Sequence, residues 1–444
     1  MALTGLQIFK LLPKTNCKEC GLPTCLAFAM ALAQKKAKLE DCPHASEEAK
    51  ASLAEAAAPP IRQVKFGVGE AQVQVGQETV MFRHDEKFYN PTVIAVSLSD
   101  KLTGDELKKR IGEINGLQFD RVGQHIQVKA ITVMNDSGSA DNFAAAATAV
   151  KDNSPLAMIL CSESAEALAA AAGKVAEAKP LLGVATTDTA EGVAKIAKDN
   201  NCPLIVQTES VEALAELTEK VKAAGVEDIV LSLKGAGLKD QLYSLSQMRA
   251  VALKKNFRPL GYPIISCTLE GSAAEQSAEA LAMVCKYSSI AVVETVEKWA
   301  ILPILTAIMN IYTDPQKPVQ VEPKVYAIGE PNEDSPLMFT TNFSLTYYTV
   351  ESDVEASRVP SYILVVDTEG TSVLTSYSGD KLNEKVVAEA MKKHEVEKLV
   401  KHKKLIIPGY VAVMSGKLEE ETGWEIVVGP RESSVLPKFL QEVA

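Results

Sequence analysis

The chain of 444 residues is longer than one ordinary domain, and its 47% hydrophobic and 23% charged residues are typical of a globular protein with a large core. Its formal net charge is −11, and it has no run of five or more basic residues. This balance argues against binding to nucleic acids or to anionic membranes, and the length predicts two or three domains.

The first residues do not resemble a signal peptide, because Lys10 and Pro13 interrupt their apolar pattern. The longest largely apolar runs, 26–33 and 299–309, are shorter than the roughly 20 residues that a membrane-spanning helix needs. We therefore expect a cytoplasmic protein, in which the cysteines should not form structural disulfides.

Four of the eight cysteines lie within the first 42 residues, at Cys17, Cys20, Cys25 and Cys42. Thiolates are soft ligands that suit either zinc or an iron–sulfur cluster. Zinc knuckles usually bring two C-x-x-C pairs, and here there is one; Pro43 follows the last cysteine, as in bacterial ferredoxins. The pattern favours iron–sulfur, and a structural zinc site stays open as the alternative.

The rest of this first segment is predicted to be helical. Residues 27–38 should form a helix leading back to Cys42, and the Ala-rich stretch 45–58 should form another that ends at Pro59-Pro60. This places a first domain at 1–58, with His44 on its surface. The four remaining cysteines are expected to be buried small apolar residues: Cys161, Cys202, Cys267 and Cys285.

The second segment, 61–322, opens with a predicted hairpin or meander and continues as regular strand–helix alternation. The meander is expected at 63–68, 71–75 and 79–83. Eight apolar strands follow, at 93–98, 128–134, 156–161, 181–185, 204–207, 228–231, 263–267 and 289–293. Helices are expected at 104–114, 163–178 (with Ser162 as its cap), 211–224 and 273–286. Eight units in this length favour a (β/α)8 TIM-like barrel over a doubly wound open sheet.

Polar residues at the carboxyl ends of these strands mark the mouth of the barrel, where barrel enzymes bind substrates. They are Asp100, Asn135, Asp136, Thr186, Thr208, Lys234, Glu270 and Glu294. No nucleophile–base arrangement accompanies them, so we name no catalytic residue and expect the barrel to serve as a scaffold or docking body.

The third segment, 323–444, follows a proline-containing link at 314–323 and is predicted to be a smaller α/β domain. Its strands are expected at 338–350, 362–367, 372–376, 404–408, 411–414 and 425–428, and its helices at 382–400 and 434–443.

The motifs of the chain resemble a known family. The run from Asn16 to Cys25, closed by Asp41-Cys42-Pro43, is similar to the four-cysteine [4Fe–4S] domain of anaerobic electron-transfer proteins. The segments 341–348 (TNFSLTYY) and 422–431 (TGWEIVVGPR), with 3–6 and 115–117, resemble the large (gamma) subunit of the corrinoid iron–sulfur protein of the reductive acetyl-CoA pathway. The resemblance covers the whole chain. It implies a cluster domain, a barrel, a C-terminal corrinoid domain and a smaller partner subunit.

A corrinoid needs apolar contact, hydroxyls and backbone that approaches closely, and in open α/β sheets ligands bind beyond the carboxyl ends of the strands. Read as strand and turn residues alone, the candidates could be purely structural; the resemblance implies that they contact the corrinoid. They are Thr346, Thr349, Thr375, Ser378, Gly379, Gly409, Tyr410, Ser415, Gly416, Gly429 and Pro430.

No histidine of the chain lies in a D-x-H-x-x-G motif, and His394 and His402 are expected on the surface. No histidine ligand to cobalt is therefore expected through that motif, and the resemblance implies a corrinoid held base-off.

The resemblance implies a methyl carrier. Cob(I)amide would take a methyl group from methyltetrahydrofolate through a methyltransferase and deliver it to acetyl-CoA synthase/CO dehydrogenase, and the cluster would return Co(II) to Co(I). The implied partners are the small subunit, both enzymes, and a reductive activator or ferredoxin. Two alternatives stay open: an electron-transfer subunit without corrinoid, and a pterin-dependent methyltransferase acting in the barrel mouth.

Overall fold

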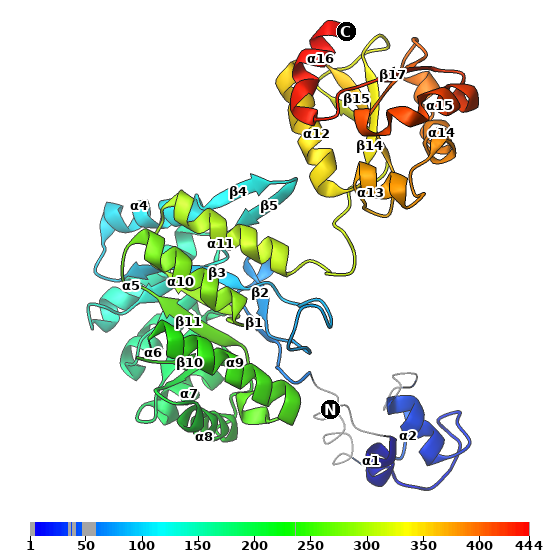
Figure 1. Cartoon of the computed structure of the whole chain (residues 1–444). Coiled ribbons are helices and arrows are strands. Elements are labelled where there is room, and N and C mark those ends of the chain that lie inside the picture. Colours follow the sequence, from blue (N-terminus) through cyan, green and yellow to red (C-terminus); the bar gives the residue numbers. More distant parts are fainter. Residues whose placement is uncertain (1–4, 34–36, 38–40, 47–58, 236, 444) are drawn as a thin grey trace. The chain divides into compact units, whose positions relative to one another are not determined.

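The computed structural model describes residues 5–33, 37, 41–46, 59–235 and 237–443 (Figure 1). The chain divides into two compact units, one of residues 1–119 and 126–312 and the other of 120–125 and 313–444. In the described ranges, no helix combines the length and apolarity needed to cross a membrane. The finer division expected from the sequence, at 1–58, 61–322 and 323–444, stays a prediction.

The N-terminal segment contains two short helices, α1 (Gly5–Leu11) and α2 (Cys25–Ala33). They share a small core in which Phe28 and Ala29 of α2 lie beside Ile8 of α1. The hydroxyl of Thr24 accepts the backbone N–H of Ala27, and this cap begins α2 two residues before the predicted start. The expected continuation of this helix to residue 38 and most of the expected helix 45–58 lie outside the described residues.

The predicted eight strands form a closed parallel barrel, so the expectation of a TIM-like barrel is confirmed and the open-sheet alternative is wrong. The strands are β3 (Val93–Ser99), β6 (Ala130–Met134), β7 (Ala157–Cys161), β8 (Leu181–Ala185), β9 (Leu204–Thr208), β10 (Ile229–Leu233), β11 (Ile264–Thr268) and β12 (Ile290–Val293). β12 pairs with β3 and closes the ring.

Eight helices surround the barrel, as Figure 1 shows. They are α4 (Gly104–Asn115), α5 (Ala140–Asn153), α6 (Ala165–Val175), α7 (Ala190–Asp199), α8 (Val211–Ala223), α9 (Leu238–Lys255), α10 (Ala273–Cys285) and α11 (Lys298–Ile311). Four begin at a serine whose hydroxyl accepts a backbone N–H of the first turn: Ser139, Ser164, Ser210 and Ser272. The cap of α6 is thus Ser164, two residues after the predicted Ser162.

Strand alternation sorts the barrel residues into two cores. Val93 and Ala95 of β3 face the interior, whereas Ile94 and Val96 pack against the helices. A hairpin of β1 (Val64–Phe66) and β2 (Val73–Val75) adds its apolar side chains to the interior core. The third expected strand of this meander, at 79–83, is not formed, and an unpredicted hairpin, β4 (Gln118–Arg121) with β5 (Gln124–Gln127), follows α4.

The C-terminal unit contains a five-stranded sheet in the order β13-β15-β14-β16-β17. The strands are β13 (Val325–Ile328), β14 (Leu337–Thr341), β15 (Ser361–Val366), β16 (Lys404–Ile407) and β17 (Glu425–Val428), with β13 alone antiparallel. One face carries α12 (Ser344–Ser357) and α16 (Leu436–Val443); the other carries α13 (Val373–Ser378), α14 (Glu384–Lys393) and α15 (Ser415–Thr422) (Figure 1).

Three predicted strands of this unit are wrong. The expected strand 338–350 divides into β14 and the helix α12. The expected strand 372–376 is the N-cap and most of α13, and 411–414 lies in the short 3-10 helix η6 (Gly409–Met414). These stretches are rich in Thr, Tyr and Val, which favour strands, but packing decides: α12 buries Tyr347 and Val354 on one side. The strands expected at 362–367, 404–408 and 425–428 are confirmed as β15, β16 and β17.

Candidate functional site

The four N-terminal cysteines differ in exposure. Cys25 and Cys42 are buried in the small core, Cys20 packs against it, and Cys17 is exposed. Asn16 holds the ligand loop: its backbone N–H donates to Cys25 Sγ at 3.3 Å, and its side-chain oxygen accepts the Cys25 N–H at 2.8 Å. Two of the four thiols are thus placed by the fold, and two lie toward the surface.

The spacing of the sulfur atoms can be compared with that of a zinc site. Tetrahedral zinc with Zn–S bonds of about 2.3 Å holds its sulfurs roughly 3.8 Å apart. Within the described residues, the one group of three potential ligands whose donor atoms lie within 4.8 Å of one another is Cys17, Glu19 and His44. No three of the four cysteine sulfurs lie within that distance of one another.

His44 and Glu19 form an exposed ion pair, with 3.0 Å between Nε2 and Oε2. This agrees with the expected surface position of His44.

The remaining cysteines fit the prediction only in part. Cys202 is buried and Cys161 half-buried, but Cys267 and Cys285 are exposed, so these two are not the buried apolar residues expected. Burial raises the pKa of Cys161 to about 12 and that of Cys202 to about 11, which keeps both protonated near neutrality.

The C-terminal unit has a cavity of about 330 Å³ at the carboxyl ends of β14 and β16. From β14 the chain continues to β15 on one side, and then crosses to β16 on the other. The cavity therefore lies at the switch point of the sheet, where open α/β sheets bind ligands. Apolar side chains from both strands and from the helices line it: Met338, Phe339, Leu345, Val350, Val373, Leu374, Ile406, Ile407 and Leu436.

Five of the predicted corrinoid residues line this cavity: Thr346, Thr349, Tyr410, Gly429 and Pro430. Gly409 lies directly beside them, since a Cβ built on it would be 2.5 Å from the Gly429 carbonyl oxygen. Thr375, Ser378, Gly379, Ser415 and Gly416 do not line it. Thr375 is exposed on α13, with its hydroxyl 3.1 Å from that of Ser372, which does line the cavity.

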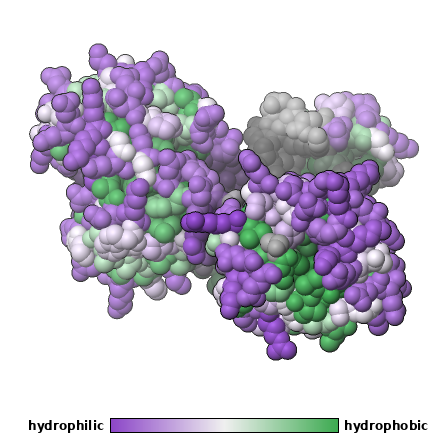
Figure 2. Space-filling view, turned by 90° about the horizontal axis from the view of Figure 1, so that it is seen from above, coloured by the Kyte–Doolittle hydropathy of each residue, from purple (hydrophilic) through white to green (hydrophobic). Residues whose placement is uncertain are grey.

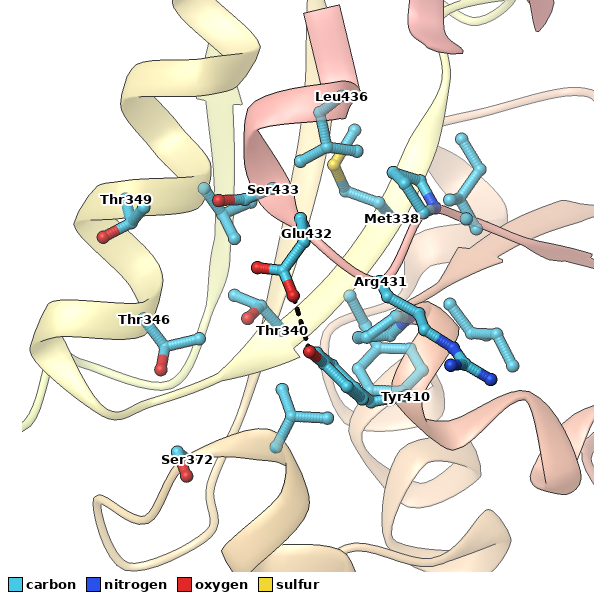
Figure 3. A pocket seen from close by; sticks show the side chains of 18 of the residues that line it. Met338, Thr340, Thr346, Thr349, Ser372, Tyr410, Arg431, Glu432, Ser433 and Leu436 are labelled. Carbon is cyan, nitrogen blue, oxygen red and sulfur yellow. Dashed lines mark hydrogen bonds between the residues drawn. The ribbon is translucent and has the colours of Figure 1, made fainter.

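Thr346 and Thr349 reach the cavity from a helix rather than from a strand end. Both belong to α12, and their spacing of three residues places them on one face of it (Figure 3). The Thr349 hydroxyl donates to the Leu345 carbonyl at 2.6 Å, so it presents its methyl group and its oxygen lone pairs to any ligand.

Tyr410 and Glu432 join two loops across the cavity. Tyr410 follows β16 and Glu432 follows β17, and the Tyr410 hydroxyl donates to Glu432 Oε1 at 2.6 Å (Figure 3). This hydrogen bond raises the pKa of Tyr410, which therefore stays protonated near neutrality. Tyr410 is 41% exposed, so it presents a flat aromatic surface at the mouth.

Sequence reasoning missed Thr340, which lines the cavity near the end of β14 and is 1% exposed. Its hydroxyl has no hydrogen-bond partner among the described residues. A buried hydroxyl without a partner is costly in a native protein, and it marks a place where a ligand or water completes the bond. The pattern of 338–350 predicts one strand and so hides the end of β14 at Thr341. Arg431, Glu432 and Ser433 also line the cavity, and no motif of the sequence marks them.

Asn342 fixes the loops around the cavity. It is fully buried, and its side-chain oxygen accepts the backbone N–H groups of Thr368 and Gly370. Its amide donates to Asp367 Oδ1 at 3.0 Å and to Gln320 Oε1 at 3.2 Å. One side chain thus ties the end of β14 to the loop between β15 and α13, which carries Ser372.

No histidine is among the described residues that line the cavity. His402 lies half-buried, with Nε2 at 2.8 Å from the Ser335 carbonyl oxygen, and His394 is half-buried at the end of α14. Both histidines were expected on the surface, and both are instead partly buried. Burial lowers the pKa of His394, with a smaller contribution from Lys393.

Of the eight polar residues predicted at the barrel mouth, Asp136 and Glu294 line a cavity there. Most of the others have local partners. Asp100 accepts from the backbone and hydroxyl of Ser137, and Asn135 donates to Ser162. The hydroxyl of Thr186 forms a hydrogen bond with that of Thr189, and the Thr208 hydroxyl donates to the Ser210 carbonyl. Lys234 forms an ion pair with Glu163, and Glu270 is exposed.

Comparison with known proteins agrees with this architecture. A family model described as the CO dehydrogenase/acetyl-CoA synthase delta subunit matches residues 63–440, and one described as a putative Fe–S cluster matches residues 12–44. About half of the chain is similar to the 7,8-dihydropteroate synthase of Vibrio fischeri, with a TM-score of 0.39 and 12% identity over 51% of this chain and 95% of that one, and this likeness carries no argument.

Two full-length relatives are similar in sequence. The corrinoid/iron–sulfur protein large subunit of Moorella thermoacetica is 46% identical over 99% of this chain and 98% of its own. The acetyl-CoA decarbonylase/synthase complex subunit gamma of Methanothermobacter thermautotrophicus is 38% identical over the whole of both chains. The resemblance expected from the sequence motifs is thereby confirmed, and the chain belongs to the family of corrinoid/iron–sulfur protein large subunits of the acetyl-CoA pathway.

Proposed function

We propose that this chain is a methyl carrier that holds a corrinoid in its C-terminal unit and a [4Fe–4S] cluster on Cys17, Cys20, Cys25 and Cys42. The observation that carries the proposal is the apolar cavity at the switch point of the C-terminal sheet, in a chain whose relative is named a corrinoid/iron–sulfur protein. The corrinoid would supply a cobalt nucleophile that accepts and donates a methyl group, while the protein binds and orients it.

The size of the cavity indicates which part of a corrinoid it would take. Its volume of about 330 Å³ is near the lower limit for a drug-sized ligand, and a corrinoid is larger. The cavity therefore suits the nucleotide tail, with Thr340 and Ser372 offering hydroxyls. The ring would rest on the exposed apolar residues at the rim, Leu345, Leu374 and Tyr410. In the view from above, Figure 2 shows hydrophobic side chains within a hydrophilic surround on this unit.

The lining of the cavity also bears on the state of the cofactor. It contains hydroxyls and apolar groups but no imidazole among the described residues. A corrinoid held there would lack a histidine ligand from this cavity, and a tail seated in the cavity would be drawn away from the metal. Both features favour the base-off form.

For the N-terminal segment, two observations support a cluster. The family model for an Fe–S cluster spans all four cysteines, and Cys25 and Cys42 are buried together in one small core. Cys25 and Cys42 would anchor the cluster in the small core, and the exposed Cys17 would lie toward an electron donor. The cluster would pass an electron from that donor to the cobalt and so return inactive Co(II) to Co(I).

The proposal carries a set of partners. They are a smaller subunit, the methyltetrahydrofolate methyltransferase that loads the carrier, acetyl-CoA synthase/CO dehydrogenase that unloads it, and a reductive activator or ferredoxin, all in the cytoplasm. The proposal also divides the chain into three domains, which are the cluster domain 1–58, the barrel 61–322 and the corrinoid domain 323–444.

The first test is metal analysis of the full chain purified anaerobically with its small subunit. We expect about four iron and one cobalt per heterodimer and no zinc. Iron without cobalt would instead favour an electron-transfer subunit, and zinc in place of iron would overturn the cluster assignment.

Variants make the cluster assignment specific. Cys20→Ala should lose most of the iron and slow the reductive reactivation of cobalt, while cobalt content stays unchanged, because the two cofactors lie in separate parts of the chain. Cys285→Ala removes an exposed cysteine at the end of α10 and should change neither metal. Equal iron loss in both variants would contradict the assignment.

A further inference from the structure

A second cavity lies in the mouth of the barrel, apart from both proposed cofactor sites. Its volume is about 650 Å³, and it lies at the ends of β3, β6, β11 and β12, beside α4. Its lining consists of Ser97, Ser99, Leu102, Glu106, Lys109, Arg110, Glu113, Met134, Asp136, Leu269 and Glu294. This size and position are those of a small-molecule site in a barrel.

Two buried hydroxyls on the neighbouring strands β3 and β6 lack partners, and one of them lines this cavity. Ser97 lines the cavity and is only 7% exposed, and its side-chain hydroxyl makes no hydrogen bond to any described residue. Thr132, its register partner on β6, is 2% exposed, and its Oγ1 also has no partner in the described part. Both side chains face inward, because Ala95 and Ala130 on the same faces of their strands belong to the interior core. Buried polar groups of native proteins are rarely left unpaired, so the Ser97 hydroxyl can bond a molecule that enters the cavity.

The charges of the lining are unbalanced. Glu113 is accompanied by Lys109 at 4.0 Å and Arg110 at 3.8 Å. Arg110 also donates to the Glu294 backbone carbonyl and not to its carboxylate. The carboxylates of Glu106, Asp136 and Glu294 have no cationic partner among the described residues, and this leaves the cavity with excess negative charge.

The cavity also has an apolar wall, formed by Leu102, Met134 and Leu269. Apolar side chains are poor neighbours for a hydrated metal ion, and the volume exceeds what one ion fills. They suit the carbon skeleton of an organic ligand. We propose that the barrel mouth binds a small organic cation, whose apolar body packs on this wall, whose charged nitrogens meet Glu294 and Asp136, and whose remaining N–H groups reach Ser97.

Benzamidinium is a suitable probe, because benzamide and benzoate share its shape and differ in charge. Calorimetric titration of the full chain with its small subunit should show binding of benzamidinium, at least about tenfold weaker binding of benzamide, and no binding of benzoate. Benzoate binding as strong as that of benzamidinium would overturn the proposal, as would no binding of benzamidinium at millimolar concentration.

Variants locate the binding. Glu294→Gln and Asp136→Asn should each weaken benzamidinium about tenfold and leave benzamide unchanged, while Glu219→Gln, an exposed residue of α8 outside the cavity, changes neither. Ser97→Ala should weaken both probes without lowering the melting temperature, since its hydroxyl has no partner to lose. Unchanged binding in all three cavity variants would overturn the proposal. Metal content and methyl transfer report separately on the methyl-carrier function.

Discussion

Thr340 and Thr341 are neighbours on β14, and the buried hydroxyls of both lack a partner among the described residues. Because strand side chains alternate, they face opposite sides of the sheet, and only Thr340 lines the cavity. An unpaired buried hydroxyl costs about 1–3 kcal/mol. Both residues therefore carry the free-energy cost of a buried unpaired hydroxyl, but only Thr340 can contact a ligand in the cavity.

We predict that Thr340→Val, which replaces the hydroxyl by a methyl group of similar size, stabilises the cofactor-free protein by about 1 kcal/mol and weakens corrinoid retention severalfold. Thr341→Val should stabilise the protein to a similar extent and leave retention unchanged. Denaturant unfolding of the cofactor-free protein and cobalt content after dialysis are the measurements. Equal loss of cobalt from both variants would show that Thr340 has no specific contact with the cofactor.

At the scale of single residues, the sequence indicates a candidate set of cysteine ligands more readily than a cavity, and that set stays a prediction. Cys17, Cys20 and Cys25 lie close together in the chain, so their spacing alone defines a ligand set. The cavity is assembled from loops up to about a hundred residues apart. A pattern that treats Thr346 as a strand residue cannot reveal that it shares a wall with Pro430.

At the scale of elements, the turn from β16 into η6 depends on a close backbone contact. A Cβ on Gly409 would lie 2.5 Å from the Gly429 carbonyl oxygen and 2.9 Å from the Arg431 nitrogen. The Gly409 N–H donates to the Pro430 carbonyl at 3.1 Å, so the loops after β16 and β17 are held together at this point. Tyr410 and Glu432 follow directly from these loops.

Gly409→Ala should therefore separate the two loops, destabilise the C-terminal unit by about 1–3 kcal/mol and lower corrinoid retention. Gly416→Ala is the matched control, because a Cβ there meets nothing within 4 Å and the residue lies in α15. It should be neutral or stabilise by about 0.5 kcal/mol. Thermal unfolding and cobalt content check both; a neutral Gly409→Ala would mean that the loops can move apart without cost.

Another element, the segment between β2 and β3, is held by a buried ion pair. Arg249 Nη2 lies 3.4 Å from Glu78 Oε2, and both side chains are less than a tenth exposed. Glu78 also accepts the N–H groups of Tyr89 and Asn90, and Arg249 donates to the Val80 carbonyl. Burial raises the pKa of Glu78 above its ordinary 4.5 more than Arg249 and these bonds lower it.

The folded state therefore binds the Glu78 proton more tightly than the unfolded chain does. The stability that Glu78 contributes is fully present below pH 4.5 and is lost as the pH rises through the raised pKa. We predict that the parent gains stability relative to Glu78→Gln, which cannot ionise, as the pH falls from 7 to 4.5. Urea unfolding at several pH values tests this; a variant that is less stable at pH 7 would show that the ion pair stabilises the fold.

The sequence predicts the elements of the barrel better than those of the C-terminal unit for a physical reason. Parallel barrel strands are buried on both faces and read as short continuous apolar runs, as in 204–207 and 290–293. The segment 338–350 combines a strand and an amphipathic helix, and the break between them is Asn342-Phe343, where tertiary hydrogen bonds rather than Gly or Pro end the strand. Local propensity carries no signal of that kind.

At the scale of the whole molecule, the link between the barrel and the C-terminal unit is short and contains two prolines. Tyr312 is held by Thr92 of the barrel unit, with 3.1 Å between their hydroxyl oxygens. Val319 is held by Ser344, whose N–H donates to its carbonyl at 3.0 Å. The six residues between them, 313–318, can span about 20 Å when extended.

A methyl carrier must present one cofactor to a loading enzyme, an unloading enzyme and a reductant in turn, so the proposed function requires the C-terminal unit to move. Deleting residues 315–318 should slow methyl transfer severalfold and leave iron and cobalt content unchanged, because both cofactor sites lie outside the link. Replacing the same four residues by Gly-Ser-Gly-Ser keeps the length and should preserve the rate. Single-turnover methyl transfer from the methyltransferase is the measurement. If the shortened chain transfers at the parental rate with full metal content, movement through this link is not part of the mechanism, and the partners must instead reach a C-terminal unit that stays in one place.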